Sequence, residues 1–324
     1  MYTEIFACPK TGSDLIFNKG NLINSNNKIY YIKDNIVDLF YDPLESKKTS
    51  EVINFYTQYP FPNYENLENI SSLIIKSKKS IFAEMLSHQL PPNKKILEVG
   101  SGTSQLSNFL SATTSSNVFA CDATYNSLKL GAKFAKKNKL KGISFTRMNI
   151  FNPCFKENSF DFIICNGVLH HTINPYKGFK KTLSLLKNDG IIILGLYSFL
   201  ARIKNTLFFL LSKVFGEKIF LLDPHIRKKI LLSNEKKISW IKDQYFHPLE
   251  KRYFLSEILK WFRLNNIELL NIIPPCSETI SKKNKLFESK IDIDLIDIMN
   301  FELQMLSSFR EGGLFLLIGK KKNI

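Results

Sequence analysis

Residues 95–110, KILEVGSGTSQLSNFL, decide the fold of this chain. A short apolar run ends at Val99, a turn with glycines at 100 and 102 follows, and an apolar pattern typical of a helix comes next. The order strand, glycine turn, helix is how α/β proteins present backbone N–H groups to a nucleotide. The dinucleotide fingerprint G-x-G-x-x-G needs a third glycine, and here that place holds Gln105. The stretch therefore predicts a nucleotide-like ligand without matching the dinucleotide motif.

Composition places the chain among folded globular proteins. Its 324 residues are 44% hydrophobic and 13% aromatic, enough for a large buried core. No C-x-x-C pair occurs among the five cysteines, which indicates a reducing compartment and predicts no metal site. We see no signal peptide, and the most apolar stretch, 199–222, is interrupted by charges. We therefore expect a cytoplasmic protein with no transmembrane segment.

The net charge of +16 raises the question of nucleic-acid binding. Only six of the 45 basic residues are arginine, the residue whose bidentate fork carries most base and phosphate recognition. Lysine accompanied by many Asn, Ile and Phe residues is also what biased codon usage alone would produce. We favour a solvated lysine surface over an RNA-binding face, and keep RNA as an alternative partner.

Strands and helices alternate between residues 95 and 197, which predicts a parallel sheet covered by helices on both faces. A helical segment interrupts the alternation, which then resumes and ends with a strand that we expect to be antiparallel. The predicted fold class is α/β, with a doubly wound, mainly parallel seven-stranded sheet, a small β-rich N-terminal appendage and a helical insertion. The strands expected after the one in the quoted stretch are 117–123, 143–151, 160–167, 191–197, 267–273 and 312–321.

Polar residues follow four consecutive predicted strands, where α/β folds bind ligands. They are the Glu98-x-Gly100-x-Gly102 turn, Asp122 twenty residues beyond it, Asn149, and the segment CNGVLHHT at 165–172. Each feature alone is weak, since glycine turns are common and an Asp after a strand is more often a helix cap. Together, in register with the strands, they predict one ligand site.

At these residues the chain resembles the class I S-adenosylmethionine-dependent methyltransferases. LEVGSGTS is similar to their first motif, and the block 160–197 is similar to their fourth and fifth strands. The resemblance covers residues 93–197, and 251–321 as the returning end of the sheet. It implies methyltransferase activity and S-adenosyl-L-methionine as the cofactor.

The resemblance also implies roles for individual residues. Gly100 and Gly102 would let the backbone approach the methionine part of the cofactor. Glu98 would orient its positively charged amino-acid end, and Asp122 would accept hydrogen bonds from both ribose hydroxyls. Asn149 stands where the family often has Asp, and its amide oxygen would accept from the adenine amino group. The remaining residues expected to contact the cofactor are Ser101, Ala123, Ile150, and, near the methyl group, Asn166 and Gly167.

The resemblance divides the chain into five parts. The segment ACPKTGSDL…NIVDLF resembles a zinc-ribbon-like domain found with some tRNA and rRNA methyltransferases, but only Cys8 of the metal-ligand set remains. Its fold is expected and its metal is not. The expected parts are a β-rich appendage at 1–41, an aromatic lid segment and helix at 42–94, the cofactor-binding core at 95–197, a helical insertion on the substrate side at 198–250, and the rest of the sheet at 251–324. Within the second part, one helix is expected over 68–90.

A nicotinamide-dependent dehydrogenase was the competing interpretation of the glycine turn. Such an enzyme can also carry an acidic residue about twenty positions further on. It would need a glycine at Gln105, and it has no use for Glu98 before the first glycine or for an inserted last strand. These residues favour the methyltransferase.

Methyl transfer needs an aligned nucleophile and sometimes a base. His171, beside His170, and His247, with Asp243 and Glu250 in position to orient it, are the candidate catalytic residues. The alternative for the His170–His171 pair is a structural role under the following helix. The alternative for His247 is a hydrogen bond within its own loop.

The aromatic stretch FYTQYPFPNY at 55–64 has two interpretations. Its rings could fill the core as a rigid strap. Alternatively, Tyr56, Tyr59 and Tyr64 could form a lid whose faces favour the sulfonium by about 1 kcal/mol of cation–π attraction.

The expected function is methylation of an oxygen, nitrogen or carbon atom on a small molecule or on a metabolite or cell-surface precursor. One alternative is an RNA methyltransferase, but CNGVLHH occupies the place of an Asn-Pro-Pro-Tyr-type motif. Another is a non-catalytic cofactor-binding partner subunit. The presence of both Glu98 and Asp122 argues against that loss of function.

Overall fold

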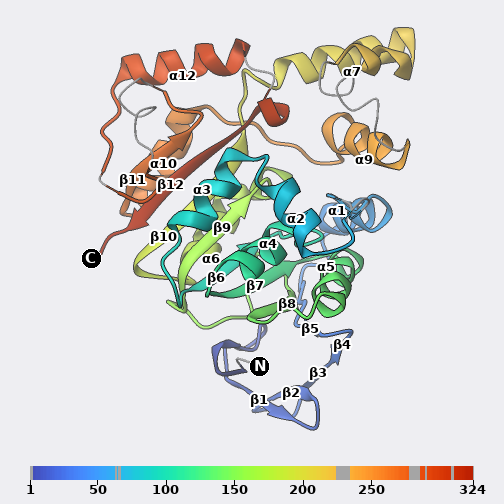
Figure 1. Ribbon diagram of the computed structural model, residues 1–324, viewed down its shortest axis with the longest axis vertical. Helices are drawn as coiled ribbons and strands as arrows, with labels where there is room; N and C mark the ends of the chain where they lie inside the picture. The colour runs from blue at the N-terminus through green and yellow to red at the C-terminus, as the bar shows by residue number, and fades with distance from the viewer. Residues whose placement is uncertain are drawn as a thin grey trace.

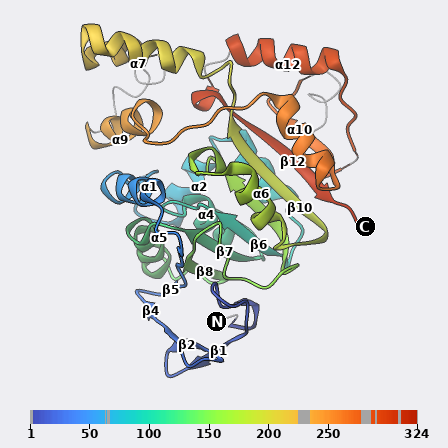
Figure 2. The same ribbon diagram turned by 180° about the vertical axis from the view of Figure 1, so that it is seen from behind.

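A nine-stranded sheet forms the centre of the computed structural model, which describes residues 3–62, 64, 67–223, 234–276, 285–288, 290–307 and 310–323. The strand order is β11-β12-β10-β9-β6-β7-β8-β5-β4. Helices α3 and α4 lie in front of the sheet in Figure 1, and α6 and α10 cover the other face in Figure 2. The sheet strands are β4 (Ile32–Lys33), β5 (Ile36–Asp38), β6 (Lys95–Val99), β7 (Asn117–Asp122), β8 (Ile143–Arg147), β9 (Phe160–Asn166), β10 (Leu186–Tyr197), β11 (Ile267–Ile273) and β12 (Leu314–Lys321).

The strand directions confirm the predicted fold class. Strands β8, β7, β6, β9 and β10 pair in parallel, and β12 runs antiparallel between β10 and β11. The seven expected strands are all present. Two further strands extend the sheet, because β5 pairs in parallel with β8 and β4 pairs antiparallel with β5. Ile36 and Val37 point to opposite faces of β5 and are 0% and 1% exposed, so this N-terminal strand is covered on both sides like a central one.

A second, three-stranded antiparallel sheet lies at the N-terminal end of the molecule, at the bottom of Figure 1. It consists of β1 (Leu15–Asn18), β2 (Asn21–Asn24) and β3 (Ile29–Tyr30). Leu15, Leu22 and Tyr30 are buried and join the main hydrophobic core. The Cys8 thiol lies 3.1 Å from the Tyr30 hydroxyl and accepts a hydrogen bond from the Asn24 amide.

One long helix was expected over 68–90, and this was wrong in detail. The structure has two helices, α2 (Ile70–Ser77) and α3 (Ile81–Gln89). The break has a local cause, since Ser80 caps the second helix by accepting a hydrogen bond from the Ala83 N–H. Asn69 caps the first helix in the same way through the Ser72 N–H.

The remaining helices pack on the sheet or project beyond it. Helix α1 lies beside α5, while α7 and α9 extend from the end of the sheet where β10 stops (Figure 1). No helix in the described ranges is long and apolar enough to cross a membrane. These helices are α1 (Lys47–Gln58), α4 (Gln105–Thr113), α5 (Tyr125–Lys137), α6 (Pro175–Leu183), α7 (Ile203–Phe215), α9 (Asn234–Tyr245), α10 (Leu255–Leu264) and α12 (Leu295–Ser307).

Candidate functional site

A cavity of about 680 Å³ lies at the carboxyl ends of β6, β7 and β9. The ends of parallel strands are where open α/β sheets bind ligands. Helices α1 and α9 contribute the walls opposite the strands, so segments far apart in the sequence enclose it. The lining comes from segments 48–62, 98–106, 121–127, 148–151, 166–173 and 240–249, with Tyr197 and Leu314.

The glycine turn forms one wall of the cavity, and its backbone admits only glycine at two places. Gly100 has φ +69°, and a Cβ there would lie 2.3 Å from a methyl group of Val168. Gly102 has φ +52°, and a Cβ there would lie 2.5 Å from the carbonyl oxygen of Phe61. Ser101 between them donates its N–H to the Cys121 carbonyl oxygen at 2.8 Å, which ties the turn to β7. Glycine is therefore required at both places by close packing, of Val168 against Gly100 and of the Phe61 backbone against Gly102, in a turn that borders the cavity.

Asp122 ends β7 and holds the glycine turn from the other side. Its Oδ2 accepts a hydrogen bond from the Gly102 N–H at 2.8 Å, and its Oδ1 accepts one from the Thr124 N–H at 2.7 Å. Burial raises the pKa of the Asp122 carboxyl, while these backbone N–H groups oppose the rise. Asp122 also borders the cavity, where its carboxylate is an acceptor for a ligand that donates hydrogen bonds.

Glu98 lies on β6 beneath the turn and is also buried. Its carboxylate accepts a hydrogen bond from the Ser107 hydroxyl. Burial raises the pKa of Glu98 to about 7, the Ser107 bond opposes this, and the charge of Asp122 adds to it. A buried carboxylate of this kind is stabilised in its charged form by a positively charged ligand group.

The asparagines after β8 and at the end of β9 differ in how much of their hydrogen-bonding capacity other protein groups already use. Asn149 donates to the Tyr41 carbonyl oxygen at 3.1 Å and accepts from the Phe151 N–H at 3.0 Å, so one oxygen lone pair is left. Asn166 lines the cavity, and its buried Oδ1 has no hydrogen-bond partner among the described residues. Gly195 on the neighbouring strand makes room for it, since a Cβ there would lie 2.0 Å from that oxygen. Asn166 thus borders the cavity while its Oδ1 packs against Gly195.

These groups fit the cofactor that the sequence resemblance implies. Two carboxylates, a tight glycine turn and the amide oxygen of Asn149 suit a compact nucleoside with a cationic amino-acid end. Ala123, Ile150 and Gly167 lie in the same lining. Thus every residue predicted to contact the cofactor borders this one cavity.

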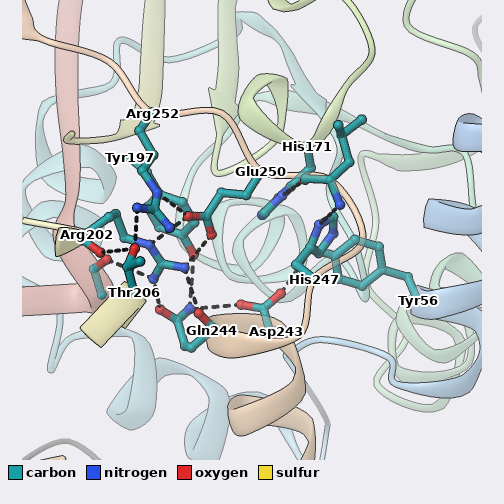
Figure 3. Close-up of polar contacts among 12 residues, drawn as sticks. Tyr56, His171, Tyr197, Arg202, Thr206, Asp243, Gln244, His247, Glu250 and Arg252 are labelled. Atoms are coloured by element: carbon teal, nitrogen blue, oxygen red, sulfur yellow. Dashed lines mark hydrogen bonds and ion pairs between the residues drawn. The ribbon is translucent and has the colours of Figure 1, made fainter. Parts of the chain in front are cut away.

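The two candidate histidines stack on each other but occupy different positions (Figure 3). Their ring centroids are 3.6 Å apart, and His171 lines the cavity whereas His247 is not among the lining residues. The Nδ1 of His171 lies 2.8 Å from the Leu249 carbonyl oxygen, an acceptor, so this nitrogen carries the proton. The Nδ1 of His247 accepts from the Leu249 N–H at 3.1 Å. Burial lowers the pKa of His171 to about 3 and that of His247 to about 2, so both rings are neutral at neutral pH.

The expectation that Asp243 and Glu250 orient His247 was wrong. Asp243 accepts hydrogen bonds from Tyr56 and Gln244, and Glu250 forms an ion pair with Arg202. The guanidinium groups of Arg202 and Arg252 bind Glu250 more strongly than a neutral imidazole would, because their hydrogen bonds are charge-assisted. Both oxygens of Asp243 already accept from Tyr56 and Gln244.

The three tyrosines of the predicted lid point to different places. Tyr56 lines the cavity and donates its hydroxyl to Asp243 at 3.0 Å. Tyr64 donates to the Thr103 carbonyl oxygen and stacks on Phe134, which supports the glycine turn from behind. Tyr59 packs against the ring of Phe55. Of these three, Tyr56 is the one placed to contact a ligand.

A buried network around Arg202 escaped the sequence analysis (Figure 3). The guanidinium, 1% exposed, donates to Gln244 at 2.6 Å and to Glu250 at 3.1 Å, and lies 4.2 Å from the ring centroid of Tyr197. Arg252 bonds the same Glu250 at 2.8 Å. One signal in the sequence pointed here, since two of only six arginines in a lysine-rich chain occur in this network.

Comparison with known proteins agrees with the fold and with a methyltransferase domain. Residues 90–247 match the family described as a methyltransferase domain. An uncharacterized protein of Methanocaldococcus jannaschii is 27% identical over 257 residues, which cover 77% of this chain and 98% of that protein. A highly reducing polyketide synthase of Gibberella fujikuroi is 28% identical over 141 residues, 40% of this chain and 5% of the synthase.

A solved structure shares the fold. PKMT2 from Rickettsia typhi superimposes with a TM-score of 0.54 at 16% identity, over 75% of this chain. The match spans 52% of the PKMT2 chain, about half its length. The same protein has been solved in complex with AdoHcy and superimposes with a TM-score of 0.53 at 15% identity.

Proposed function

We propose that the methyltransferase domain of this chain uses S-adenosyl-L-methionine to methylate a small, largely apolar molecule inside the cavity. The observation that carries this proposal is the shape of the site. A cavity of about 680 Å³ is within the range of small-molecule pockets, and helices α1 and α9 close it opposite the strands. Such a site suits a compact acceptor better than a base in a long polynucleotide.

We assign the strand side of the cavity to the cofactor, which supplies an electrophilic methyl group when bound. Glu98 would pair with its ammonium group and Asp122 would accept from its ribose hydroxyls. The remaining oxygen lone pair of Asn149 is available to the adenine, and Asn166 borders the cavity at the methyl end. The glycine turn borders the same side of the cavity and is assigned to the amino-acid part.

We assign the opposite side of the cavity to the acceptor. Residues of the segments 42–94 and 198–250 supply these walls, as the proposed division of the chain into cofactor and substrate parts requires. Most of their lining side chains are apolar or aromatic, including Val52, Phe61 and Leu249. An apolar wall gains free energy from an apolar acceptor and excludes water from the methyl transfer.

The pKa of Glu98 gives a pH prediction for cofactor binding. Its pKa in the ligand-free protein, about 7, is above the usual carboxyl value, and pairing with the cofactor's ammonium requires the ionised form. Affinity for S-adenosylmethionine should therefore rise with pH, by up to about tenfold per unit below pH 7, and level off above it. Isothermal titration between about pH 5.5 and pH 8, in buffers of different ionisation enthalpy, should also detect the proton released on binding.

The matched control is Glu98→Gln, which keeps the shape and can still accept from Ser107. The burial-raised pKa of Asp122 acts in the same direction as that of Glu98. The variant should therefore bind more weakly at pH 8 and show a shallower pH dependence. A wild-type affinity that stays constant across this range would contradict the assignment of Glu98.

A narrowing of the acceptor side tests the proposed function directly. Val52 is half-buried on α1, one of the segments assigned to the acceptor, and lines the cavity, so Val52→Trp should fill acceptor space. Wild-type protein supplied with methyl-labelled S-adenosylmethionine should label a low-mass metabolite extract. The variant should lose most of this labelling while its cofactor affinity stays within about threefold.

Total RNA in the same assay examines the competing function. Labelled RNA with an unlabelled metabolite extract would contradict the small-acceptor proposal. RNA binding by the basic surface should fall steeply with salt, whereas cofactor-dependent labelling of a small acceptor should depend on salt only weakly.

A further inference from the structure

Asp243 is an acidic group in the cavity that the cofactor assignment does not use. It lies on α9 and lines the same cavity as Asp122 and Asn166, although its side chain is only 5% exposed. Its Oδ1 accepts a hydrogen bond from the Tyr56 hydroxyl at 3.0 Å, and its Oδ2 accepts one from the Gln244 amide at 2.9 Å. Figure 3 shows Asp243 between Gln244 and Tyr56.

The hydrogen bonds that fix Asp243 come from neutral groups. Arg202, the nearby cation, is itself engaged by Glu250 and by Gln244. Burial raises the pKa of the Asp243 carboxyl, the bonds from Tyr56 and Gln244 and the charge of Arg202 oppose this, and the charge of Glu250 adds to it. Asp243 is thus a buried carboxylate without an ion-pair partner of its own among the described residues.

The surroundings hold Asp243 in a defined position. The Gln244 Oε1 accepts from Arg202 at 2.6 Å, so its Nε2 is left to donate to Asp243 and to the Tyr197 hydroxyl. Gly312 fits closely against Gln244, since a Cβ there would lie 2.1 Å from that Oε1. A carboxylate held this firmly is preorganised, as a proton acceptor or an anchor for a substrate group must be.

The charges of the cavity favour a ligand that donates hydrogen bonds. Among its described lining residues the acidic ones are Glu98, Asp122 and Asp243, and Lys48 is the basic one. The histidines are poor candidates for a base, because burial lowers the pKa of both and His247 does not line the cavity. A base works best when its pKa is near the working pH. Burial raises the pKa of the Asp243 carboxyl from its usual acidic value toward that pH.

We propose that Asp243 accepts the proton of the methyl acceptor and that Tyr56 positions it, so that the acceptor carries a hydroxyl or amine group on an apolar body. This inference rests on the proposed small-acceptor function. The acceptor's O–H or N–H donates to Asp243. Its oxygen or nitrogen then forms a bond to the methyl carbon, the carbon–sulfur bond breaks with its electron pair kept by sulfur, and the acceptor's proton ends on the carboxyl of Asp243.

Three matched probes test the inference without knowledge of the natural acceptor. Benzyl alcohol and benzylamine can donate to Asp243, and benzyl methyl ether cannot. Protein loaded with S-adenosylhomocysteine is titrated with each probe and followed by ligand-observed NMR. At least one donor probe should bind wild type about tenfold or more tightly than the ether, and its affinity should rise with pH as Asp243 ionises. Benzylamine is largely protonated at neutral pH and can also pair with a carboxylate as a cation, so the comparison of the alcohol with the ether tests the hydrogen bond itself.

The variants distinguish a proton-accepting carboxylate from a merely structural one. Asp243→Asn keeps the shape but cannot ionise, so the donor probes should lose both their advantage and their pH dependence. Tyr56→Phe removes one donor to Asp243, which should raise the pKa of the carboxyl and move the pH midpoint of donor-probe binding upward. This second variant serves also if Asp243→Asn does not fold.

The outcomes separate this inference from the proposed function. Equal binding of all three probes to wild type, or an unchanged pH profile in both variants, would overturn the role of Asp243 and leave the small-acceptor function standing. Failure of all three probes to bind wild type would contradict the small-acceptor function and this inference together. Cofactor affinity in both variants, measured alongside, shows that the strand side of the cavity is intact.

Discussion

Replacing Asp122 with alanine is expected to weaken S-adenosylmethionine binding by about 100-fold or more. The change removes two proposed charge-assisted hydrogen bonds to the ribose. It also leaves the N–H groups of Gly102 and Thr124 without the carboxylate that now accepts from them at 2.8 and 2.7 Å. The glycine turn would lose part of its support, so both the direct contact and the shape of the cradle would suffer. Isothermal titration at neutral pH measures the loss.

Two comparisons make this result specific. Asp122→Asn keeps the shape and one oxygen acceptor, so its affinity should fall between those of wild type and the alanine variant. Asp189 is a carboxylate with a 57% exposed side chain paired with Lys320, far from the cavity lining, and Asp189→Ala should change the affinity by less than about twofold. Unchanged binding in Asp122→Ala, or none in wild type, would refute the cofactor assignment.

The part of the fold that the sequence predicted is the part encoded locally. The glycine turn and the alternation of apolar strands with helices are each visible within short stretches of sequence. The parallel core and the antiparallel β12 could therefore be predicted from the pattern. The extra strands β4 and β5 depend on a pairing between residues about a hundred positions apart, such as Val37 with Thr146. No local period records such a pairing. The single helix expected over 68–90 failed for the opposite reason, because a local cap at Ser80 was overlooked.

The candidate site also has a part that could be predicted from the sequence and a part that could not. The residues on the strand side follow one another in motifs at the ends of β6, β7 and β9, and so sequence alone brings them together. The acceptor side is assembled from separate segments, where Tyr56 meets Asp243 across nearly two hundred residues. The spacing of residues in the sequence cannot predict that contact. The histidines were predicted as the catalytic residues instead of Asp243 because histidine is common in catalysis. Only the burial of the rings, which lowers their pKa, shows why that choice is weak.

Arg202→Met is expected to lower the free energy of unfolding by about 3–5 kcal/mol, a typical cost of breaking a buried charge network. Arg202 joins the start of α7 to α9 and to the turn before β12, through Gln244, Glu250 and the Gly312 carbonyl oxygen. Methionine can fill the space beside Tyr197 but donates no hydrogen bond, so the Gln244 oxygen and one side of Glu250 lose their partner. Denaturant unfolding should show the loss as a lower midpoint.

Two further variants determine whether the geometry or the charge of Arg202 accounts for its contribution to stability. Arg202→Lys keeps the charge but not the planar fork that reaches three acceptors at once, so we expect it to recover only part of the stability. Arg252→Met removes the more exposed partner of the same Glu250, and should cost less than half as much because Arg202 still pairs with that carboxylate. An Arg202→Met protein as stable as wild type would show that the network does not hold α9 in place. Because α9 carries Asp243, the folded fraction of Arg202→Met should also lose the preference for hydrogen-bond-donating probes. It should retain cofactor binding, because the residues assigned to the cofactor lie on the other side of the cavity.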